Sequence, residues 1–172
     1  MKKITHFFKI LLLPVLILIS KFGMAAHHHE NFDYFFSPEI QWKNEENQSV
    51  SFKQWENHSI SIIMAYTSCR TSCPLLIRRL RELQDQVQNK NQISDFIFVT
   101  LDPRIDTPKR LKQFKQNWNL NNQWHFLTGT KELTQKLSRA LGIKYHETGG
   151  HIVHDSKIFL ISKDQKISEI QI

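Results

Sequence analysis

The fold is decided by the stretch from Ile60 to Gln88, "ISIIMAYTSCRTSCPLLIRRLRELQDQVQ", which contains both cysteines of the chain. Residues 60–67 are almost all β-branched or apolar, as is typical of a strand buried on both faces of a parallel or mixed sheet. Behind Pro74, a helical stripe of apolar residues predicts an amphipathic helix with the proline at its first position. Cys69 and Cys73 therefore lie on the turn from a strand into a helix.

This position favours reactive thiols. Free backbone N–H groups and the positive end of the helix dipole stabilise thiolate over thiol, which predicts lowered pKa values for Cys69 and Cys73. Thiolates attack disulfides and bind soft metals. A purely structural disulfide is the alternative, but a bridge over so short a loop restrains the unfolded chain little. We therefore expect the pair to carry chemistry.

The rest of the chain alternates strands and helices. Strands are predicted at 95–101, 124–128, 157–161 and 166–172, together with a strand pair around the acidic turn in 40–52. Helices are predicted after Thr107, with Pro108 as the first residue, and after Thr130, closed by Gly142. A β-rich start, two strand–helix units and a C-terminal hairpin predict an α/β, thioredoxin-like fold with a central mixed sheet flanked by helices.

The first 26 residues have the layout of a secretory signal, with lysines before an apolar run and a small-residue ending at Ala25 and Ala26. An uncleaved membrane anchor is the alternative, although the apolar run is short for a spanning helix. We expect a signal peptide at 1–26, a flexible leader at 27–39, and one domain at 40–172. Export places the protein in the periplasm, where the two cysteines can form a disulfide, hold a metal or exchange electrons.

The basic composition is no argument for a nucleic-acid partner. The presumed signal holds four lysines and no acidic residue, so its removal lowers the formal charge from +7 to +3. The basic cluster at 78–81 fits a solvated helix face. The tryptophans show no stacking pattern for bases and fit core packing.

Three features separate the chain from a simple thioredoxin-type reductase. The cysteines have three residues between them instead of two, the usual flanking glycine and tryptophan are missing, and no proline follows Pro108. Another group must therefore face the thiols. His154 precedes the strand 157–161 on a loop that this topology returns past the cysteines, and two thiolates with one imidazole suit copper as Cu(I) or Cu(II). His151 is a weaker competitor, and a hydrogen-bonded loop histidine is the alternative.

Two functions from different classes remain on this basis. One is a copper-binding chaperone that uses Cys69, Cys73 and His154. The other is a thiol-disulfide oxidoreductase in which one of the two cysteines attacks a target disulfide and the other resolves it. A thiol peroxidase ranks third because the spacing between Thr67 and Cys69 does not fit the threonine–cysteine motif of such sites.

Several segments resemble the Sco/SenC family of exported thioredoxin-like copper chaperones, in order and spacing, over most of residues 50–172. They are "YTSCRTSCP", "VTLDPRIDTPKRLKQF", "WHFLTGT", "LGIKY" and "HDSKIFLIS". The resemblance implies copper held by Cys69, Cys73 and His154, with delivery to, or reduction of, the copper site of cytochrome c oxidase. The implied partners are the copper-bearing oxidase subunit and a thioredoxin-like reductant or another copper chaperone.

Other positions of the resemblance leave alternatives open. Asp102 matches the aspartate of the family's Asp-Pro motif, with either a catalytic role or a role in organising the turn into the helix after Thr107. Family members usually continue into a terminal helix after the last hairpin, whereas this sequence stops at Ile172. This difference leaves three alternatives open. A partner covers the exposed part of the sheet, the helix is dispensable, or the sequence is incomplete.

A second histidine cluster, at 27–29, follows the presumed cleavage site. Cleavage after Ala25 or Ala26 leaves a histidine at position three of the new N-terminus. A free amine, two backbone amides and that imidazole form a square-planar set that suits Cu(II). A polar leader without bound metal is the alternative.

Overall fold

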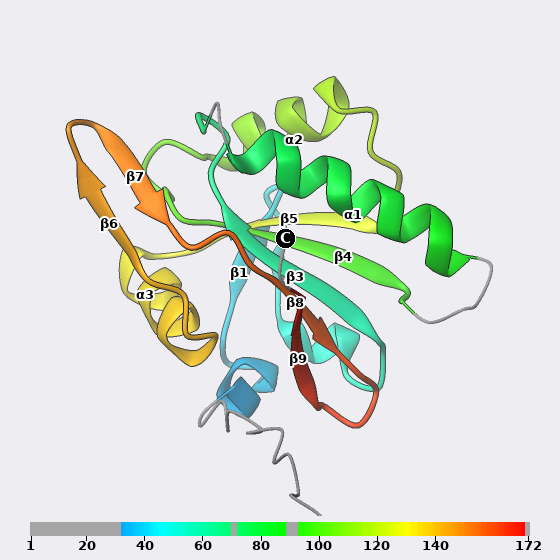
Figure 1. The fold of residues 1–172 in the computed structure, drawn as a ribbon. Coiled ribbons are helices and arrows are strands. Elements are labelled where there is room, and N and C mark those ends of the chain that lie inside the picture. Colours follow the sequence, from blue (N-terminus) through cyan, green and yellow to red (C-terminus); the bar gives the residue numbers. More distant parts are fainter. Residues whose placement is uncertain (1–31, 70–71, 89–92, 171–172) are drawn as a thin grey trace, which may run out of the picture.

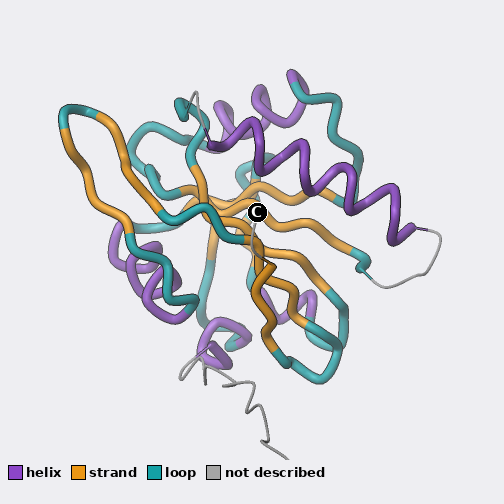
Figure 2. Tube along the Cα trace, in the orientation of Figure 1, coloured by secondary structure: helices purple, strands orange, loops and turns teal. Residues whose placement is uncertain are grey.

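The computed structural model describes residues 32–69, 72–88 and 93–170. A seven-stranded sheet has the strand order β2-β1-β5-β4-β3-β8-β9, and β6 and β7 form a separate two-stranded sheet (Figures 1 and 2). The strands are β1 (Trp42–Asn44), β2 (Ser49–Val50), β3 (Ile60–Ala65), β4 (Asp95–Thr100), β5 (Trp124–Thr128), β6 (Tyr145–Thr148), β7 (His151–His154), β8 (Ile158–Ile161) and β9 (Ile167–Ile170). The helices are α1 (Ser72–Gln88), α2 (Pro108–Asn117) and α3 (Lys131–Ala140), with 3-10 helices η1 (Phe32–Phe36) and η2 (Phe52–Trp55).

The central mixed sheet flanked by helices confirms the predicted fold class. β3, β4 and β5 pair in parallel, while β1 and β8 add antiparallel strands on either side. Helices α1 and α2 cover one face of the sheet and α3 lies on the other (Figure 1). The strand pair in 40–52 and the C-terminal hairpin are also confirmed, as β1–β2 and β8–β9.

The predicted helix starts are confirmed for two of the three helices. The Thr107 and Thr130 side chains accept hydrogen bonds from backbone N–H groups in the first turns of α2 and α3. Helix α1 differs, because it begins at Ser72 and makes Pro74 its third residue instead of its first. A proline is tolerated there because the N–H groups of a first helical turn have no partner inside the helix.

The N-terminal part of the domain extends further than the sequence indicates. Residues 32–36, assigned above to the flexible leader, form η1 with Phe32, Phe35 and Phe36 buried. These rings pack against one another and against Phe52 of η2. This part of the leader therefore belongs to the packed domain. A run of aromatic side chains at "FDYFF" is favoured in a core because each ring buries a large apolar area.

The predicted signal at 1–26 and the histidines at 27–29 lie outside the described residues. No described helix combines the length and the apolar character needed to cross a membrane.

The sheet brings three distant segments to one edge. The parallel strands β3 and β4 end at the same edge of the sheet, where β3 leads into Cys69 and β4 into the loop at 101–107. Strand β8 pairs antiparallel with β3, and Ile158 lies opposite Ile63. The residues that precede Ile158 therefore run past the end of β3, and this arrangement brings His154 to the cysteines.

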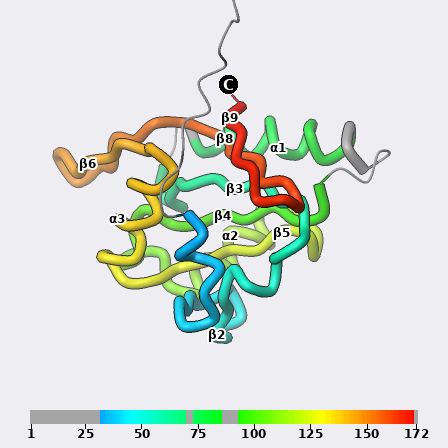
Figure 3. The backbone as a smooth tube through the Cα atoms, turned by 90° about the horizontal axis from the view of Figure 1, so that it is seen from below, coloured from blue at the N-terminus to red at the C-terminus, as the bar shows by residue number. Residues whose placement is uncertain are grey.

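The β6–β7 hairpin was not predicted from the sequence. It turns at Gly149 and Gly150, both with positive φ values of 55° and 79°, which glycine adopts without strain. Seen from below, β6 extends to one side of the seven-stranded sheet (Figure 3). His154 is the last residue of β7, so it belongs to a strand and not to the predicted loop.

Candidate metal centre

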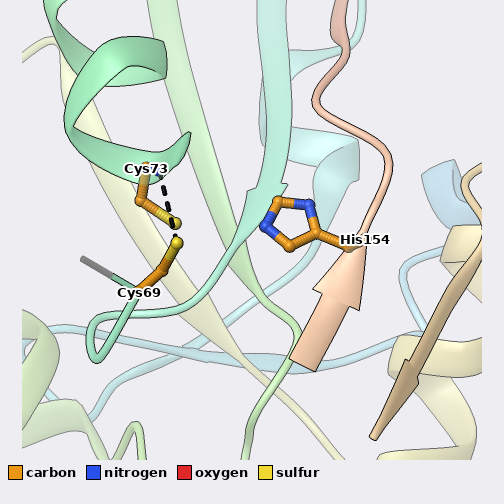
Figure 4. Close-up of side chains that lie close together, drawn as sticks. All are labelled: Cys69, Cys73 and His154. Carbon is orange, nitrogen blue, oxygen red and sulfur yellow. Dashed lines mark hydrogen bonds between the residues drawn. The ribbon is translucent and has the colours of Figure 1, made fainter. Parts of the chain in front are cut away.

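Cys69 and Cys73 are not joined in a disulfide and both are buried, with 8% and 1% of their surfaces exposed. The chain turns directly after β3, where the Cys69 N–H donates to the Tyr66 carbonyl at 3.2 Å. The Cys73 backbone N–H, in the first turn of α1, points at the Cys69 sulfur at 3.5 Å (Figure 4). The turn thus places the two sulfurs side by side at the start of the helix, as the sequence predicts.

His154 faces the two sulfurs from the end of β7 (Figure 4). One ligand atom from each of Cys69, Cys73 and His154 can be chosen so that all three lie within 4.8 Å of one another. Among the described residues, this is the one group of three or more histidine, cysteine or acidic side chains that meets this criterion. The three residues singled out from the sequence are therefore brought together.

The His154 ring is oriented as a metal ligand requires. Its Nδ1 lies 2.8 Å from the Asp155 carbonyl oxygen, which is an acceptor, so Nδ1 carries the proton. The neutral ring then has its lone pair on Nε2. Nε2 is buried and has no hydrogen-bond partner among the described residues. A buried nitrogen lone pair without a partner, beside two thiols, fits a soft metal ion that takes sulfur and imidazole ligands.

His151 does not join this group. Its backbone pairs with Thr148 beside the hairpin turn, and it is exposed. Side chains alternate along a strand, so His151 and Val153 lie on the face of β7 opposite to Ile152 and His154. The alternation explains why the strand directs only one of the two histidines toward the sulfurs.

The electrostatics of Cys73 differ from the expectation. Burial raises the pKa of the Cys73 thiol, and the neighbouring Cys69 adds to the increase, while a hydrogen bond with the Tyr66 backbone opposes it. The predicted lowering by the helix start is therefore wrong for this residue, because removal from water disfavours the charged thiolate more than the helix start favours it. Cys73 is a protonated thiol at neutral pH until a metal or a redox partner takes the place of its proton.

A buried carboxylate that was not predicted from the sequence holds the segment from Thr67 to Cys69, the cysteine loop. Asp106 is 0% exposed and accepts hydrogen bonds from the Thr67 N–H at 2.9 Å, the Thr67 hydroxyl at 2.5 Å and the Thr100 hydroxyl at 2.6 Å. Arg110 lies 3.5 Å from the same carboxylate. Burial raises the pKa of Asp106, although the hydrogen bonds from Thr100 and Thr67 act in the opposite direction. The second aspartate of "DPRIDTP" was the sequence signal for this residue.

Asp102, the first aspartate of that segment, organises the turn. One of its carboxylate oxygens accepts a bond of 3.4 Å from the Ile105 N–H, and its carbonyl oxygen accepts from the N–H groups of Ile105 and Asp106. These contacts agree with the turn role considered for Asp102. The turn places the Asp106 carboxylate within hydrogen-bond distance of Thr67, at the start of the cysteine loop.

Cys69 and His154 open onto a groove of about 1110 Å³ between the β6–β7 hairpin and the loop that follows β4. Its walls include two exposed apolar side chains, Ile105 and Val153. Cys73 lies behind Cys69 at the start of α1 and is almost fully buried. A molecule in the groove therefore meets Cys69 and His154 before Cys73.

The model of the SCO1/SenC family matches residues 29–171. The chain belongs to the SCO1/SenC family. A SCO1 protein homolog from Bacillus subtilis is 28% identical to this SCO1/SenC chain over 132 residues, which are 73% of this chain and 68% of the homolog. A protein from Stutzerimonas stutzeri whose name describes copper binding is 26% identical over 134 residues, 74% of this chain and 64% of the relative.

Solved structures agree with the family assignment. BsSco, described as a member of the Sco family of cytochrome c oxidase assembly proteins with a disulfide switch, superimposes with a TM-score of 0.65 at 25% identity. The superposition covers 75% of this chain and 78% of BsSco. The likeness confirms the thioredoxin-like fold.

Proposed function

We propose that this SCO1/SenC chain is an exported copper-binding metallochaperone that acts in the assembly of cytochrome c oxidase. Cys69, Cys73 and His154 bind the copper ion as its cargo. The observation that carries the proposal is the buried His154 Nε2, which has no hydrogen-bond partner among the described residues and faces the two cysteine sulfurs. Neither thiol-disulfide exchange nor core packing needs such a nitrogen.

The chain's own groups account for binding. The Asp155 carbonyl fixes the proton on His154 Nδ1 and so keeps Nε2 free to coordinate. Both cysteines lose their protons when copper binds, since thiolate is the form that coordinates. Two soft sulfurs suit Cu(I), and the imidazole supports both oxidation states. The expected site of action is the periplasm, and the expected recipient is the copper-bearing subunit of the oxidase.

A thiol-disulfide oxidoreductase is the second candidate, favoured by two adjacent cysteine sulfurs at a helix start that are not joined in a disulfide. In that reaction one thiolate attacks a disulfide of the client. The client's S–S bond breaks, one client sulfur leaves as a thiolate, and a mixed disulfide forms. The second thiolate then attacks the sulfur of Cys69 or Cys73 in that bond and releases the reduced client, so the two-electron oxidation ends as a Cys69–Cys73 disulfide. This reaction does not need His154.

Replacement of His154 separates the two functions. For His154→Ala we expect Cu(II) affinity to fall by at least about 100-fold, the upper end of the effect of losing a partner of a metal ligand. Cu(I) affinity is expected to fall much less, because two thiolates can still hold this ion. The Cys69–Cys73 disulfide should still form. Competition with chelators in both oxidation states measures the affinities.

His151→Ala is the matched control, since it removes a histidine from the opposite face of the same strand. It should bind copper like the parent. Under limiting copper, cells that depend on the protein for oxidase assembly should fail with His154→Ala and grow with His151→Ala. Normal assembly and parental copper binding in His154→Ala, with both cysteines still essential, would favour thiol-disulfide exchange instead.

A further inference from the structure

Tyr66 connects the two segments that carry the candidate ligands. It follows β3 directly, three residues before Cys69, and its side chain is 7% exposed. Its hydroxyl donates a hydrogen bond to the backbone carbonyl oxygen of Ile152 at 3.0 Å. Ile152 lies in β7, two residues before His154. One side chain thus joins the strand that leads to Cys69 with the strand that ends at His154.

The ring of Tyr66 also touches the imidazole. The two ring centroids lie 5.8 Å apart with an interplanar angle of 75°, so that the rings meet edge to face. The backbone carbonyl of the same residue accepts the N–H of Cys69. The Tyr66 side chain also lies beside the Cys69 side chain. Burial raises the pKa of the phenol, and the neighbouring Cys69 adds to the increase. Tyr66 therefore contacts both Cys69 and His154 without being one of the three ligand residues.

The Tyr66 hydrogen bond is one of several links between the β6–β7 hairpin and the rest of the domain, since Tyr145 and Ile152 also pack against the core. The two strands of the hairpin pair with each other and not with the seven-stranded sheet. The Arg104–Glu147 ion pair also links the hairpin to the body of the domain, at 3.5 Å, but its side chains are 74% and 61% exposed. Exposed ion pairs contribute little to the free energy of folding. The hydrogen bond from Tyr66 is part-buried, and its acceptor Ile152 lies two residues before His154.

We propose that Tyr66 is a positioning residue of the copper site, which fixes His154 over the sulfurs through the Ile152 carbonyl and thereby strengthens Cu(II) binding relative to Cu(I). The inference rests on the copper-binding function proposed above. The selectivity follows from the ligand chemistry, because the imidazole matters more for Cu(II) and the two thiolates can hold Cu(I) alone. A group that orients a metal ligand changes metal affinity without touching the metal.

Tyr66→Phe tests the inference in the full chain, since it removes only the hydroxyl and keeps the ring contact with His154. We expect Cu(II) affinity to fall about tenfold, the lower end of the range for such groups, and Cu(I) affinity to stay within about threefold of the parent. The electron paramagnetic resonance spectrum of the Cu(II) form should change in its ligand hyperfine pattern. Parental Cu(II) affinity together with a parental spectrum would overturn the inference.

Tyr34→Phe is the matched control, because Tyr34 lies on η1 and its ring contacts Phe35 and Lys136. It should leave both affinities and the spectrum unchanged; a Tyr66 effect reproduced by Tyr34→Phe would contradict the positioning role. Equal losses of Cu(I) and Cu(II) affinity in Tyr66→Phe would also contradict it, since they would indicate general damage.

Hydrogen exchange of the copper-free protein keeps the inference testable if the proposed function fails. Tyr66→Phe should speed amide exchange in residues 151–154 and leave exchange in β8 at the parental rate. If the parent binds no copper at the cysteines, the proposed function is wrong, whereas faster exchange in β7 would still establish that Tyr66 holds the strand. Unchanged amide exchange in β7 would show that the Tyr66 hydrogen bond does not hold this strand, and it would contradict the positioning role.

Discussion

In a chain that carries His27→Ala, His28→Ala and His29→Ala, replacing both Cys69 and Cys73 by serine is expected to lower bound copper from about one ion per chain to nearly none after reconstitution and desalting. Serine keeps the shape of cysteine, but its hydroxyl is a hard, protonated oxygen that does not replace a soft thiolate as a copper ligand. The thiolate-to-copper charge-transfer absorption of the Cu(II) form should vanish as well. Elemental analysis and visible spectroscopy of the purified full chain measure both effects.

The histidines at 27–29 require a control because they form an alternative ligand set that suits Cu(II). A variant with His27→Ala, His28→Ala and His29→Ala should keep the charge-transfer absorption and the cysteine-bound copper. The combination of these changes with the double cysteine variant should bind no copper. If the double cysteine variant keeps the copper content and the spectrum of the parent in this background, the assignment of the ligands is wrong.

Asp106→Ala is expected to lower the free energy of unfolding by about 3 kcal/mol, since it leaves buried donors without their acceptor and removes the carboxylate that pairs with Arg110 at 3.5 Å. The Thr67 N–H and the Thr67 and Thr100 hydroxyls lose their carboxylate partner. The cysteine loop starts at Thr67, so copper affinity should fall together with stability. Urea unfolding monitored by circular dichroism measures the change.

Two variants separate the effect of Asp106 from that of acidic residues in general. Asp102→Ala, which loses one long hydrogen bond at 3.4 Å, should cost less than about 1 kcal/mol. Asp106→Asn keeps the shape and one acceptor oxygen, so it should fall between the parent and Asp106→Ala. Equal stability of Asp106→Ala and Asp102→Ala would show that the buried network does not hold the loop.

Much of the fold could be predicted because local and long-range signals agree. The apolar run at 60–65 is buried at every position, as a central strand requires. Thr107 and Thr130 cap their helices as the sequence predicts. The position of His154 next to the cysteines also followed from topology, since a strand antiparallel to β3 must be entered from the cysteine edge.

The β6–β7 hairpin was harder to predict because "YHETGGHIVH" contains few apolar residues and is largely exposed. Its strands gain little from burial, so the alternation of apolar and polar residues is weak. The Gly149-Gly150 pair was a usable turn signal. The packing of η1 was missed for a different reason, since a short aromatic run has no helical or strand period that identifies it.

The electrostatics of the site depend on tertiary contacts. A helix start predicts a lowered thiol pKa for Cys73, but its burial beneath Cys69 reverses the direction. Asp106 is one of two aspartates in "DPRIDTP", and only the fold shows that its side chain turns under Thr67 while Asp102 serves the turn. The sequence singled out Asp102 but not Asp106, and only three-dimensional packing shows the separate roles of the two aspartates.

X-ray absorption at the copper edge tests the central claim most directly. The measurement uses the Cu(I)-loaded chain in which alanine replaces the histidines at 27–29. The account predicts two sulfur ligands and one imidazole nitrogen, with the imidazole signal lost in the matched His154→Ala sample and both sulfurs retained. A copper environment of nitrogen and oxygen without sulfur, or an imidazole signal that survives His154→Ala, would contradict the assignment of Cys69, Cys73 and His154 as the copper ligands.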